Sequence, residues 1–368
     1  MMDKTIGIIF LGDFFTDGRC VNMANSILDS GAKLFIIDAN PTGKNKYRNA
    51  IIHHIDLQNR QKGVVRYWKF HKGIVKILHT LKFDTLISAD LFSLGATSKF
   101  QQSARIVYDS REIYSELAAL SNKPHYQFFW TNFEKYFIRK CNSIIVTAES
   151  DGTYLKSIYP KIPEPIVIKN LPPSKMLKFS TIDLRRQLDI TDKQKMFLYQ
   201  GVIQHGRGLK IMVDLLEHFP DGVCVFIGKG DFTEEVKNYA KQKKCENRVF
   251  FVGAVPYLEL LSYTVEADIG FSLIEPISKS YIHALPNKLY EYFLAGIPTI
   301  ASDFPEMTKA IENYSSGAVV SPNDFPKIVE TVSNLLEQDY NRENNQQIAL
   351  QNFVWEIQDQ ILLETLGL

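Results

Sequence analysis

The segment from Leu285 to Ile300 combines residue types that could bind a phosphate group and a ribose. Pro286 can open a helix, and Asn287 and Lys288 then fall in its first turn. The unpaired backbone N–H groups and the positive dipole end of that turn would stabilise a diphosphate. Glu291 follows one turn later on the same face, where its carboxylate could accept hydrogen bonds from both hydroxyls of a ribose. Taken alone, Glu291 would be interpreted as a solvated helix residue.

A second segment, Tyr199–Leu209, places Gly201, Gly206 and Gly208 between a predicted strand and an amphipathic helix. Glycines allow the backbone to approach a phosphate closely, and Arg207 supplies a charged fork. The G-x-G-x-x-G spacing of a dinucleotide site is absent, so this is not the dinucleotide fingerprint. The alternative interpretation is an ordinary strand-to-helix turn that carries a surface arginine.

Two further loops at strand ends carry weaker signals. Ile227–Asp231 contains Gly228 and Gly230 and is predicted to point toward the same place as the two stronger segments. Phe251–Pro256 ends the next strand, and there a flat base could rest on backbone and on apolar atoms such as those of Val252. Ligands of open parallel sheets bind beyond the carboxyl ends of the strands, which is where these loops would lie.

Charged residues also follow the first predicted strand. The loop Gly12–Arg19 carries Asp13, Asp17 and Arg19, which could meet a second substrate. The alternative is a capping loop, since Asp17 is a plausible helix N-cap. Tyr108–Glu116 is another charged loop that follows a strand.

The elements that would position these loops alternate between strands and helices. Short runs of consecutive apolar residues, β-branched or aromatic, predict strands buried on both faces. Strand and helix in alternation imply parallel sheets with helices on both sides. The predicted strands are Ile6–Leu11, Lys33–Asp38, Thr85–Ser88, Arg105–Tyr108 and Ser143–Thr147 in the first half, and Met196–Gln200, Val223–Ile227, Arg248–Val252, Ile269–Ser272, Thr299–Ala301 and Ala318–Val320 in the second.

The run Asn170-Leu171-Pro172-Pro173 breaks regular structure and marks a boundary between two domains. A charged stretch follows it before the next strand begins. We predict an α/β protein with two doubly wound, Rossmann-like domains that face each other across a central cleft, at residues 1–172 and 173–349. The length of 368 residues is sufficient for two domains of ordinary size.

The composition is typical of a globular protein, with 45% hydrophobic and 23% charged residues. No run approaches the roughly 20 apolar residues that span a bilayer, and the first residues lack the cationic start and cleavage site of a signal peptide. A cytoplasmic location is therefore expected. The eight histidines show no metal-ligand spacing, so no metal is expected. Four scattered cysteines predict reduced thiols: Cys20, Cys141, Cys224 and Cys245.

The net charge of +1 conceals an asymmetry between the halves of the chain. Residues 1–180 carry 25 Lys and Arg against 15 Asp and Glu, and the remainder carries 17 against 26. A basic half suggests an anionic membrane face or a phosphate-bearing partner, although the charges could simply solvate two surfaces. The stretch Val64–Leu81 is basic and amphipathic, so it could lie on an anionic membrane or pack its apolar face on the sheet.

The run Leu285–Pro298, with Tyr199–Leu209 upstream, resembles the donor site of glycosyltransferase family 4, a retaining family with the GT-B fold. The residues from Asp17 to Gly31 loosely resemble the family's early Asp-x-Arg-Val pattern. Tyr108–Glu112 is similar to its Tyr-Asp-x-His-Glu segment, with Arg111 in place of the histidine. The tail at about 350–368 looks like the terminal helix that crosses back to the first domain in this fold.

The resemblance implies a nucleotide-sugar donor in the C-terminal domain and an acceptor in the N-terminal domain. Glu291 matches the second Glu of the family's E-x7-E motif, which binds the donor ribose, and His283 stands where the first Glu would fall. Arg207 matches a basic residue on the diphosphate. The charge of the departing diphosphate would be stabilised by fixed amides and cations without a metal, and a front-face route would retain the anomeric configuration.

The residues implied by these arguments form three sets. Those expected in catalysis are Arg207, Lys288 and Arg111. Those expected at the donor are Glu291, Gly201, His205, Gly206, Gly228, Gly230, Val252, Pro286, Asn287, Leu289 and His283. Those expected at the acceptor are Gly12, Asp13, Asp17, Arg19 and Asp90.

The favoured function is transfer of a sugar, from UDP by family habit, to a glycan or polyprenyl-phosphate-linked acceptor of cell-envelope polysaccharide, on the inner face of the plasma membrane. UDP and GDP carriers both stay open, and no nucleic acid is expected. A nucleotide-sugar epimerase or a phosphorylase of the same fold is an alternative, although the required carboxylates, histidines or cofactor lysine are not found. A non-catalytic partner protein is another, suggested by His283, Ala89 and Arg111.

Overall fold

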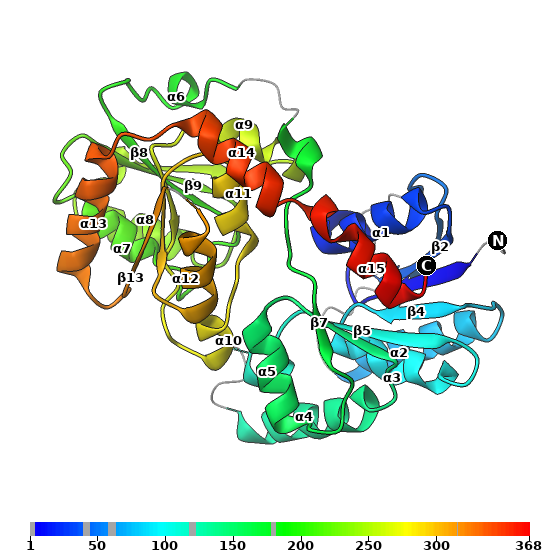
Figure 1. Ribbon diagram of the computed structural model, residues 1–368. Helices are drawn as coiled ribbons and strands as arrows, with labels where there is room; N and C mark the ends of the chain where they lie inside the picture. The colour runs from blue at the N-terminus through cyan, green and yellow to red at the C-terminus, as the bar shows by residue number, and fades with distance from the viewer. Residues whose placement is uncertain (1–3, 40–44, 58–63, 118–122, 178–181, 315) are drawn as a thin grey trace. The chain divides into compact units, whose positions relative to one another are not determined.

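The computed structural model describes residues 4–39, 45–57, 64–117, 123–177, 182–314 and 316–368. The chain divides into two compact units (Figure 1). The N-terminal unit comprises Met1–Asn170 together with Gln358–Leu368, and the C-terminal unit comprises Leu171–Ile357. The predicted α/β architecture of two parallel-sheet, Rossmann-like domains is confirmed.

The N-terminal unit is built on a seven-stranded parallel sheet with the order β3-β2-β1-β4-β5-β6-β7. Its strands are β1 (Thr5–Ile9), β2 (Lys33–Ala39), β3 (Ile51–Ile55), β4 (Thr85–Ser88), β5 (Arg105–Ser110), β6 (Ser143–Val146) and β7 (Pro165–Val167). The central strands are fully buried, as their uninterrupted apolar runs predicted. The two edge strands were not predicted, because β3 has two histidines in its five residues and β7 is only three residues long.

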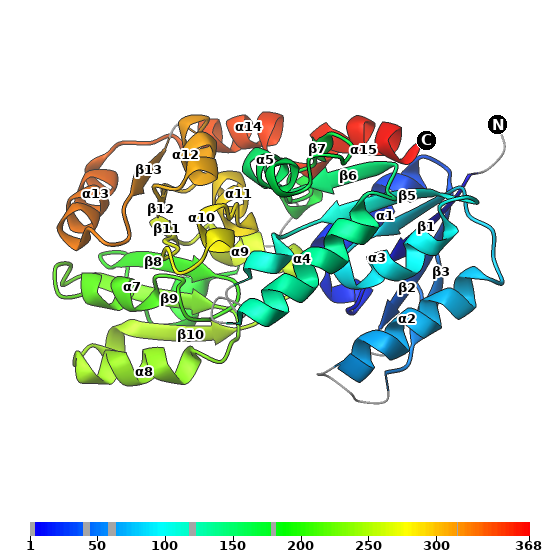
Figure 2. The same cartoon turned by 90° about the horizontal axis from the view of Figure 1, so that it is seen from below.

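Helices cover both faces of this sheet. They are α1 (Gly18–Asp29), α2 (Val64–Leu78), α3 (Leu91–Thr97), α4 (Pro124–Ile138) and α5 (Glu149–Ile158). Figure 2 shows α2, α3 and α4 along the same face of the sheet. The apolar face of α2, with Phe70, Ile74 and Leu78, belongs to the core, so the sheet-packing interpretation of this stretch holds for that face.

The C-terminal tail completes the N-terminal unit. Helix α15 (Asp359–Leu366) packs against α1 and β5. Ser26 Oγ donates to Asp359 Oδ1 at 2.6 Å, and Thr85 Oγ1 donates to the carbonyl of Leu366 at 2.9 Å. The returning segment begins at Gln358 rather than near residue 350, because the preceding helix α14 (Arg342–Asn352) packs on α11 of the C-terminal unit.

A buried carboxyl group in the N-terminal unit should make stability depend on pH. Glu134 of α4 accepts hydrogen bonds from the hydroxyls of Tyr108, at 2.7 Å, and Tyr159, at 3.1 Å. Burial raises the pKa of Glu134 from 4.5 to about 7, although the two tyrosines partly oppose the shift. The folded state therefore holds a proton that the unfolded state has released, and this stabilisation is lost as the pH rises through about 7.

Glu134→Gln, which cannot ionise, should lack this loss. Between pH 5 and pH 8 the free energy of unfolding of the wild type should fall relative to that of the variant by about 3 kcal/mol. Urea unfolding at the two pH values measures the difference. Parallel pH profiles for the two proteins would show that the buried carboxyl group does not carry the effect.

The C-terminal unit has a six-stranded parallel sheet with the order β10-β9-β8-β11-β12-β13. The strands are β8 (Lys195–Gln200), β9 (Gly222–Ile227), β10 (Val249–Gly253), β11 (Ile269–Ser272), β12 (Thr299–Ser302) and β13 (Gly317–Val320). Each of the six was predicted, within one or two residues at either end. The chain reverses direction across the sheet between β8 and β11, so the loops after these two strands flank a topological switch point, where such sheets bind ligands.

The helices of the C-terminal unit are α6 (Leu184–Gln187), α7 (Leu209–Leu215), α8 (Thr233–Gln242), α9 (Leu260–Thr264), α10 (Lys279–Ile282), α11 (Asn287–Ala295), α12 (Pro305–Glu312), α13 (Phe325–Glu337) and α14. All four cysteines of the chain are buried and unpaired. Among the described residues, no helix is long and apolar enough to cross a membrane, and no group of three metal-ligating side chains comes together.

Candidate functional site

Helix α11 carries the strongest sequence signal and is almost entirely buried. It packs against α9, α14, β11 and β12. Pro286 is its N-cap, and Gly296 ends it in the left-handed region at a φ of 72°. Tyr292 fixes the helix to the sheet, because its hydroxyl accepts from the backbone N–H of Gln200 at 3.2 Å and donates to the carbonyl of Phe271 at 3.2 Å. The first turn of α11 is thereby held beside the end of β8.

Glu291 is 4% exposed, so it is not a solvated helix residue. Its Oε2 accepts a hydrogen bond from Gln200 Nε2 at 2.5 Å, and the other end of that amide accepts from Thr264 Oγ1 at 2.8 Å. Tyr257 also hydrogen-bonds the carboxyl group. Burial raises the pKa of Glu291, while Gln200, Lys288 and Tyr257 oppose the shift. These contacts hold the carboxyl group in one position. A carboxyl group that accepts hydrogen bonds from two ribose hydroxyls must be fixed in this way.

Lys288 is a buried cation, only 8% exposed. Its Nζ lies 3.5 Å from the ring centroid of Tyr199, a cation–π contact. Burial lowers the pKa of Lys288 well below its usual value, and repulsion from Arg207 lowers it further, with Glu291 opposing. Burial and Arg207 therefore disfavour the charged form of Lys288, and a bound anion beside it would favour that form.

Arg207 lies in the loop after β8, stacked on an aromatic ring. Its guanidinium carbon is 4.4 Å from the ring centroid of Tyr281 in α10. In the amide orientation that satisfies its neighbours, the oxygen of Gln204 accepts from Arg207 Nη2 at 3.0 Å and Nε at 3.1 Å. These contacts hold the planar fork in place, and its remaining N–H donors could serve a phosphate.

The glycines of three successive strand-end loops bring their backbones into contact. The N–H of Gly201 donates to the carbonyl of Ile227 at 2.9 Å, and that of Gly228 donates to the carbonyl of Gly253 at 2.8 Å. A Cβ at Gly228 would lie 1.8 Å from the carbonyl oxygen of Gly201, and one at Gly230 would lie 1.9 Å from that of Ile203. These glycines are required by loop-to-loop packing, which the sequence alone does not reveal.

Other residues predicted at the donor take different positions around these loops. His205 is exposed, with its ring edge-on to Phe232 at 5.5 Å. Val252 and His283 are partly buried. Leu289 is fully buried, and its N–H donates to the carbonyl of Pro286, so it belongs to the core rather than to the surface of the site.

In the N-terminal unit, the predicted acceptor residues Asp17 and Arg19 form an ionic cluster with Asp109 and Arg111. Arg19 is buried and pairs with Asp109, with Nη2 2.7 Å from Oδ1, and its Nη1 donates to the carbonyl of Ile168. Arg111 forms salt bridges with both Asp109, at 2.9 Å, and Asp17, at 2.6 Å. Burial alone would raise the pKa of Asp109, but the two guanidinium groups outweigh it and lower the pKa. Arg19 therefore stabilises the fold, and a contact between Arg19 and an acceptor would require its salt bridge with Asp109 to break.

The aspartates of the first loop cap local elements. Asp17 is the N-cap of α1 and accepts from the N–H of Cys20, so the capping interpretation applies, while its other oxygen binds Arg111. Asp13 caps the 3-10 turn that follows. Asp90 caps α3 and also accepts from the N–H of Leu11. Gly12 packs against the ring of Phe10. These contacts place the loop at the carboxyl edge of the first sheet.

Comparison with known proteins gives the site its family. The profile of the family described as "Glycosyl transferases group 1" matches residues 180–351, which include β8 to β13 and all of α11. Residues 180–351 form a glycosyltransferase group 1 domain. With its two parallel-sheet units, the chain is a glycosyltransferase of the GT-B type, as the resemblance of its motifs predicted.

Relatives of this glycosyltransferase extend over most of the chain. A protein of Haemophilus influenzae described as an uncharacterized glycosyltransferase is 23% identical over 348 residues, which cover 91% of this chain and 88% of the relative. The structure of sucrose-phosphate synthase from Thermosynechococcus elongatus has a TM-score of 0.82 at 16% identity, with 98% of each chain covered. That of Anabaena Alr3699/HepE in complex with UDP-glucose has a TM-score of 0.76 at 15% identity, with 98% and 99% covered. At these identities the solved structures establish the fold.

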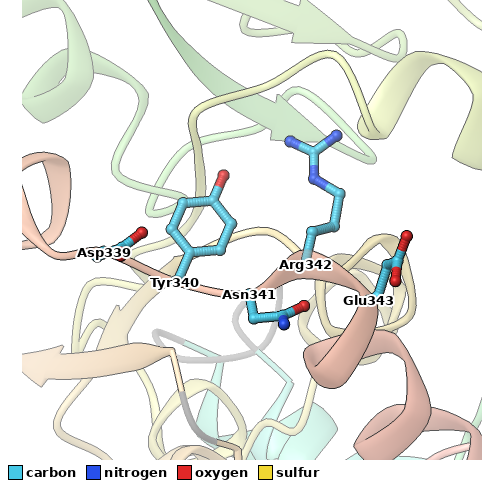
Figure 3. A pocket seen from close by; sticks show the side chains of 5 residues that line it. All are labelled: Asp339, Tyr340, Asn341, Arg342 and Glu343. Atoms are coloured by element: carbon cyan, nitrogen blue, oxygen red, sulfur yellow. The ribbon is translucent and has the colours of Figure 1, made fainter.

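A cavity elsewhere in the glycosyltransferase is separate from these residues. It has a volume of about 660 Å³ and is lined by Asp339 to Glu343, between α13 and α14 (Figure 3). Tyr340 and Arg342 extend to the same side of this segment in the close view. Arg342 Nη1 donates a hydrogen bond to the carbonyl of Val265 at 2.6 Å, and this contact stabilises the fold. None of the predicted site residues lines this cavity.

The loop contacts of the glycosyltransferase predict a strong effect for Gly228→Ala. The added Cβ would meet a backbone carbonyl that cannot move without breaking the loop, so we expect a loss of about 2 kcal/mol or more in the free energy of unfolding. Gly253→Ala is the matched control, because Gly253 also has a positive φ, 86°, but has no atom within 4 Å of the added Cβ. Thermal unfolding of both variants measures the difference, and equal losses would contradict the steric explanation.

Proposed function

We propose that this glycosyltransferase transfers a sugar, with retention, from a UDP-sugar to a glycan or polyprenyl-phosphate-linked acceptor in cell-envelope polysaccharide biosynthesis, at the inner face of the plasma membrane. The donor assignment rests on the placement of Lys288 and Glu291 one turn apart on α11. Both side chains are buried, and one is basic while the other is acidic. Burial and Arg207 lower the pKa of Lys288, so a bound anion would favour its charged form. Glu291 is held by Gln200, and its carboxyl group would accept hydrogen bonds from the ribose hydroxyls.

In this proposal the diphosphate of the donor lies at the first turn of α11, near Lys288 and Arg207. Asn287 and the backbone of Pro286 belong to the same turn. Gly201, Gly206, Gly228 and Gly230 let the strand-end loops pack closely, and the backbone of these loops would approach the phosphates. Val252 and His205 would border the nucleoside. Glu291 binds the ribose. The complex of Anabaena Alr3699/HepE with UDP-glucose supports the choice of UDP as the carrier.

The proposed chemical step breaks the bond between the anomeric carbon and the diphosphate oxygen. The acceptor hydroxyl forms its bond to the same face of that carbon, and its proton passes to the leaving phosphate oxygen. Negative charge grows on the diphosphate as the bond breaks, so Lys288 and Arg207 stabilise the transition state more than the ground state. No metal is required in this proposal, because fixed cations and helix amides meet the charge.

For the acceptor we propose the first loop of the N-terminal unit. Asp13 and Asp17 would contact acceptor hydroxyls, and Arg111 would meet an acceptor phosphate while Asp90 and Gly12 shape the loop. Arg19 would support Arg111 through Asp109, with which both arginines pair. His283 is proposed to border the transferred sugar.

The test is a transfer assay with purified protein, EDTA, a lipid-linked acceptor preparation, and a panel of UDP- and GDP-sugars. We expect UDP release from one UDP-sugar, a product with the anomeric configuration of the donor, and no requirement for a divalent cation. Release from a GDP-sugar alone, or an inverted product, would refute the donor or the stereochemical part. Absence of transfer with every donor, together with retained nucleotide binding, would favour the non-catalytic partner.

A further inference from the structure

The outward face of α4 carries aromatic side chains in a stripe that the structure leaves uncovered. Phe129 and Tyr136, seven residues apart, are 56% and 61% exposed. Phe128 and Tyr126 of the same helix are 73% and 49% exposed. Phe128 is the most exposed of the large hydrophobic side chains in the described part of the chain. Such a concentration on one helix is unusual for a surface that faces only water.

Helix α2 adds one more exposed aromatic residue, with a cation beside it. Trp68 is 54% exposed, and Lys72 Nζ lies 3.7 Å from the centroid of its ring. Val65, one turn before Trp68, is also exposed. Lys72 and Lys76 follow on the same side of the helix and are exposed, while the opposite side belongs to the core. This face combines an amphipathic aromatic ring with basic side chains, as interfacial helices do.

The two helices belong to one surface. Tyr67 of α2 stacks on Phe92 of α3 at 4.8 Å and meets the ring of Trp130 of α4 edge-on at 5.5 Å. Phe92 and Trp130 also contact each other at 5.3 Å. This aromatic cluster joins α2 and α4 across α3 on the same face of the sheet (Figure 2). We call the exposed faces of α2 and α4 together the aromatic–basic face.

The charge on the aromatic–basic face has one sign. Helix α2 has no acidic residue, and the single acidic residue of α4, Glu134, is buried. The basic residues of the two helices and their ends are Arg66, Lys69, Lys72, Lys76, Lys123, Lys135, Arg139 and Lys140. An acidic surface is therefore the complementary partner, and an apolar layer must lie close to it to accept the aromatic rings.

We propose that the aromatic–basic face docks this glycosyltransferase on an anionic lipid bilayer, with Phe128, Phe129 and Trp68 entering the boundary between headgroups and acyl chains. Lys72 and Lys135 would contact lipid phosphates, and the aliphatic parts of their side chains would lie along the apolar layer. The proposal deepens the proposed function, on which it rests for the lipid-linked acceptor. It adds α4, which carries no membrane signal in the sequence pattern, to the part of α2 that does.

The bilayer is favoured over an acidic protein surface by the kind of residues exposed. Phe128 and Phe129 are exposed on α4, and the basic residues are spread along both helices. A planar, fluid, negatively charged surface can accept this arrangement, because its lipids rearrange around each ring and each ammonium group.

The test is co-sedimentation of the full chain with vesicles of phosphatidylcholine alone or with 30% phosphatidylglycerol. We expect binding to the anionic vesicles, weakening as salt is raised, and little binding to neutral ones. The double variant Phe128→Ser/Phe129→Ser should bind at least about tenfold more weakly. Lys72→Gln/Lys135→Gln should lose the preference for anionic vesicles. Ile361→Ser is the matched control, because Ile361 is an exposed apolar residue of the same unit, on α15, and should bind as the wild type does.

Trp68 gives a direct readout of docking. Its fluorescence should shift to the blue on anionic vesicles and be quenched by brominated acyl chains, and both signals should be lost in Trp68→Phe. Absence of vesicle binding by the wild type, or equal binding by the Phe128→Ser/Phe129→Ser variant, would overturn the proposal and direct the search to a protein partner or a second copy of the chain. Stabilisation by UDP, measured on the same variants without vesicles, should be unchanged, so a failure of docking is distinct from a failure of the donor site.

Discussion

Arg207→Ala should lower the turnover number of sugar transfer roughly 10²–10³-fold, with a much smaller change in the KM for the donor. The guanidinium group is held by Tyr281 and Gln204 in a fixed orientation, so it costs no reorganisation when charge develops on the leaving diphosphate. Its interaction with that charge is strongest in the transition state, and its removal therefore affects kcat more than ground-state binding.

Two variants make this expectation specific. Arg207→Lys keeps the charge but loses the planar fork and should recover only part of the rate. Arg186→Ala removes an exposed arginine of α6 in the same unit and should leave kcat unchanged. Steady-state kinetics of the three variants shows whether Arg207 acts in the chemical step. If Arg207→Ala raised KM alone, the arginine would be a binding residue without a role in that step.

Glu291→Ala should weaken donor binding by about 10- to 100-fold, because two charge-assisted hydrogen bonds to the ribose are lost. Glu291→Gln should lie between the wild type and the alanine variant, since an amide oxygen can still accept from a hydroxyl. Removing the carboxylate also deprives Gln200 Nε2 of this hydrogen-bond acceptor, so a loss of stability is expected as well.

Stability and binding can be separated with a second buried glutamate. Glu306 of α12 is as buried as Glu291 and lies 3.7 Å from Lys309. Glu306→Ala should lower the melting temperature without changing the affinity for UDP, measured by isothermal titration. If Glu291→Ala bound UDP as tightly as the wild type, the ribose assignment would be wrong.

Local sequence signals were sufficient for the parts of the site that lie within one element. Pro286 and Gly296 bound α11 as predicted, because a proline start and a left-handed glycine end are properties of a few consecutive residues. The six strands of the second sheet were predictable for the same reason, since each is a short, continuous apolar run.

What the sequence did not reveal depends on packing between distant segments. Gln200 and Tyr257 hold Glu291, and Tyr281 holds Arg207, but the partners are 34 to 91 residues apart in the chain, and nothing in their spacing indicates contact. The pair of Arg19 and Asp109, 90 residues apart, is of the same kind. Arg19 was expected at the surface of the acceptor loop, but its side chain is buried and pairs with Asp109.

The fold also explains why the exposed aromatic residues of α4 escaped notice. Seven of its 15 residues are Phe, Tyr or Trp, distributed around the helix, so the pattern does not distinguish a core face from an exposed face. Only the packing of Trp130 and Phe133 toward α3 shows which aromatic rings are left outside.

The measurement that tests the central claim most directly is a thermal-shift panel of UDP, GDP, ADP and CMP without added metal, on the wild type and on Glu291→Ala. The account predicts that UDP stabilises the wild type, by about 2.7 kcal/mol at 100 times its Kd, and that the variant loses most of this stabilisation. Stabilisation of neither protein by any of the nucleotides would contradict a nucleotide-sugar site on α11.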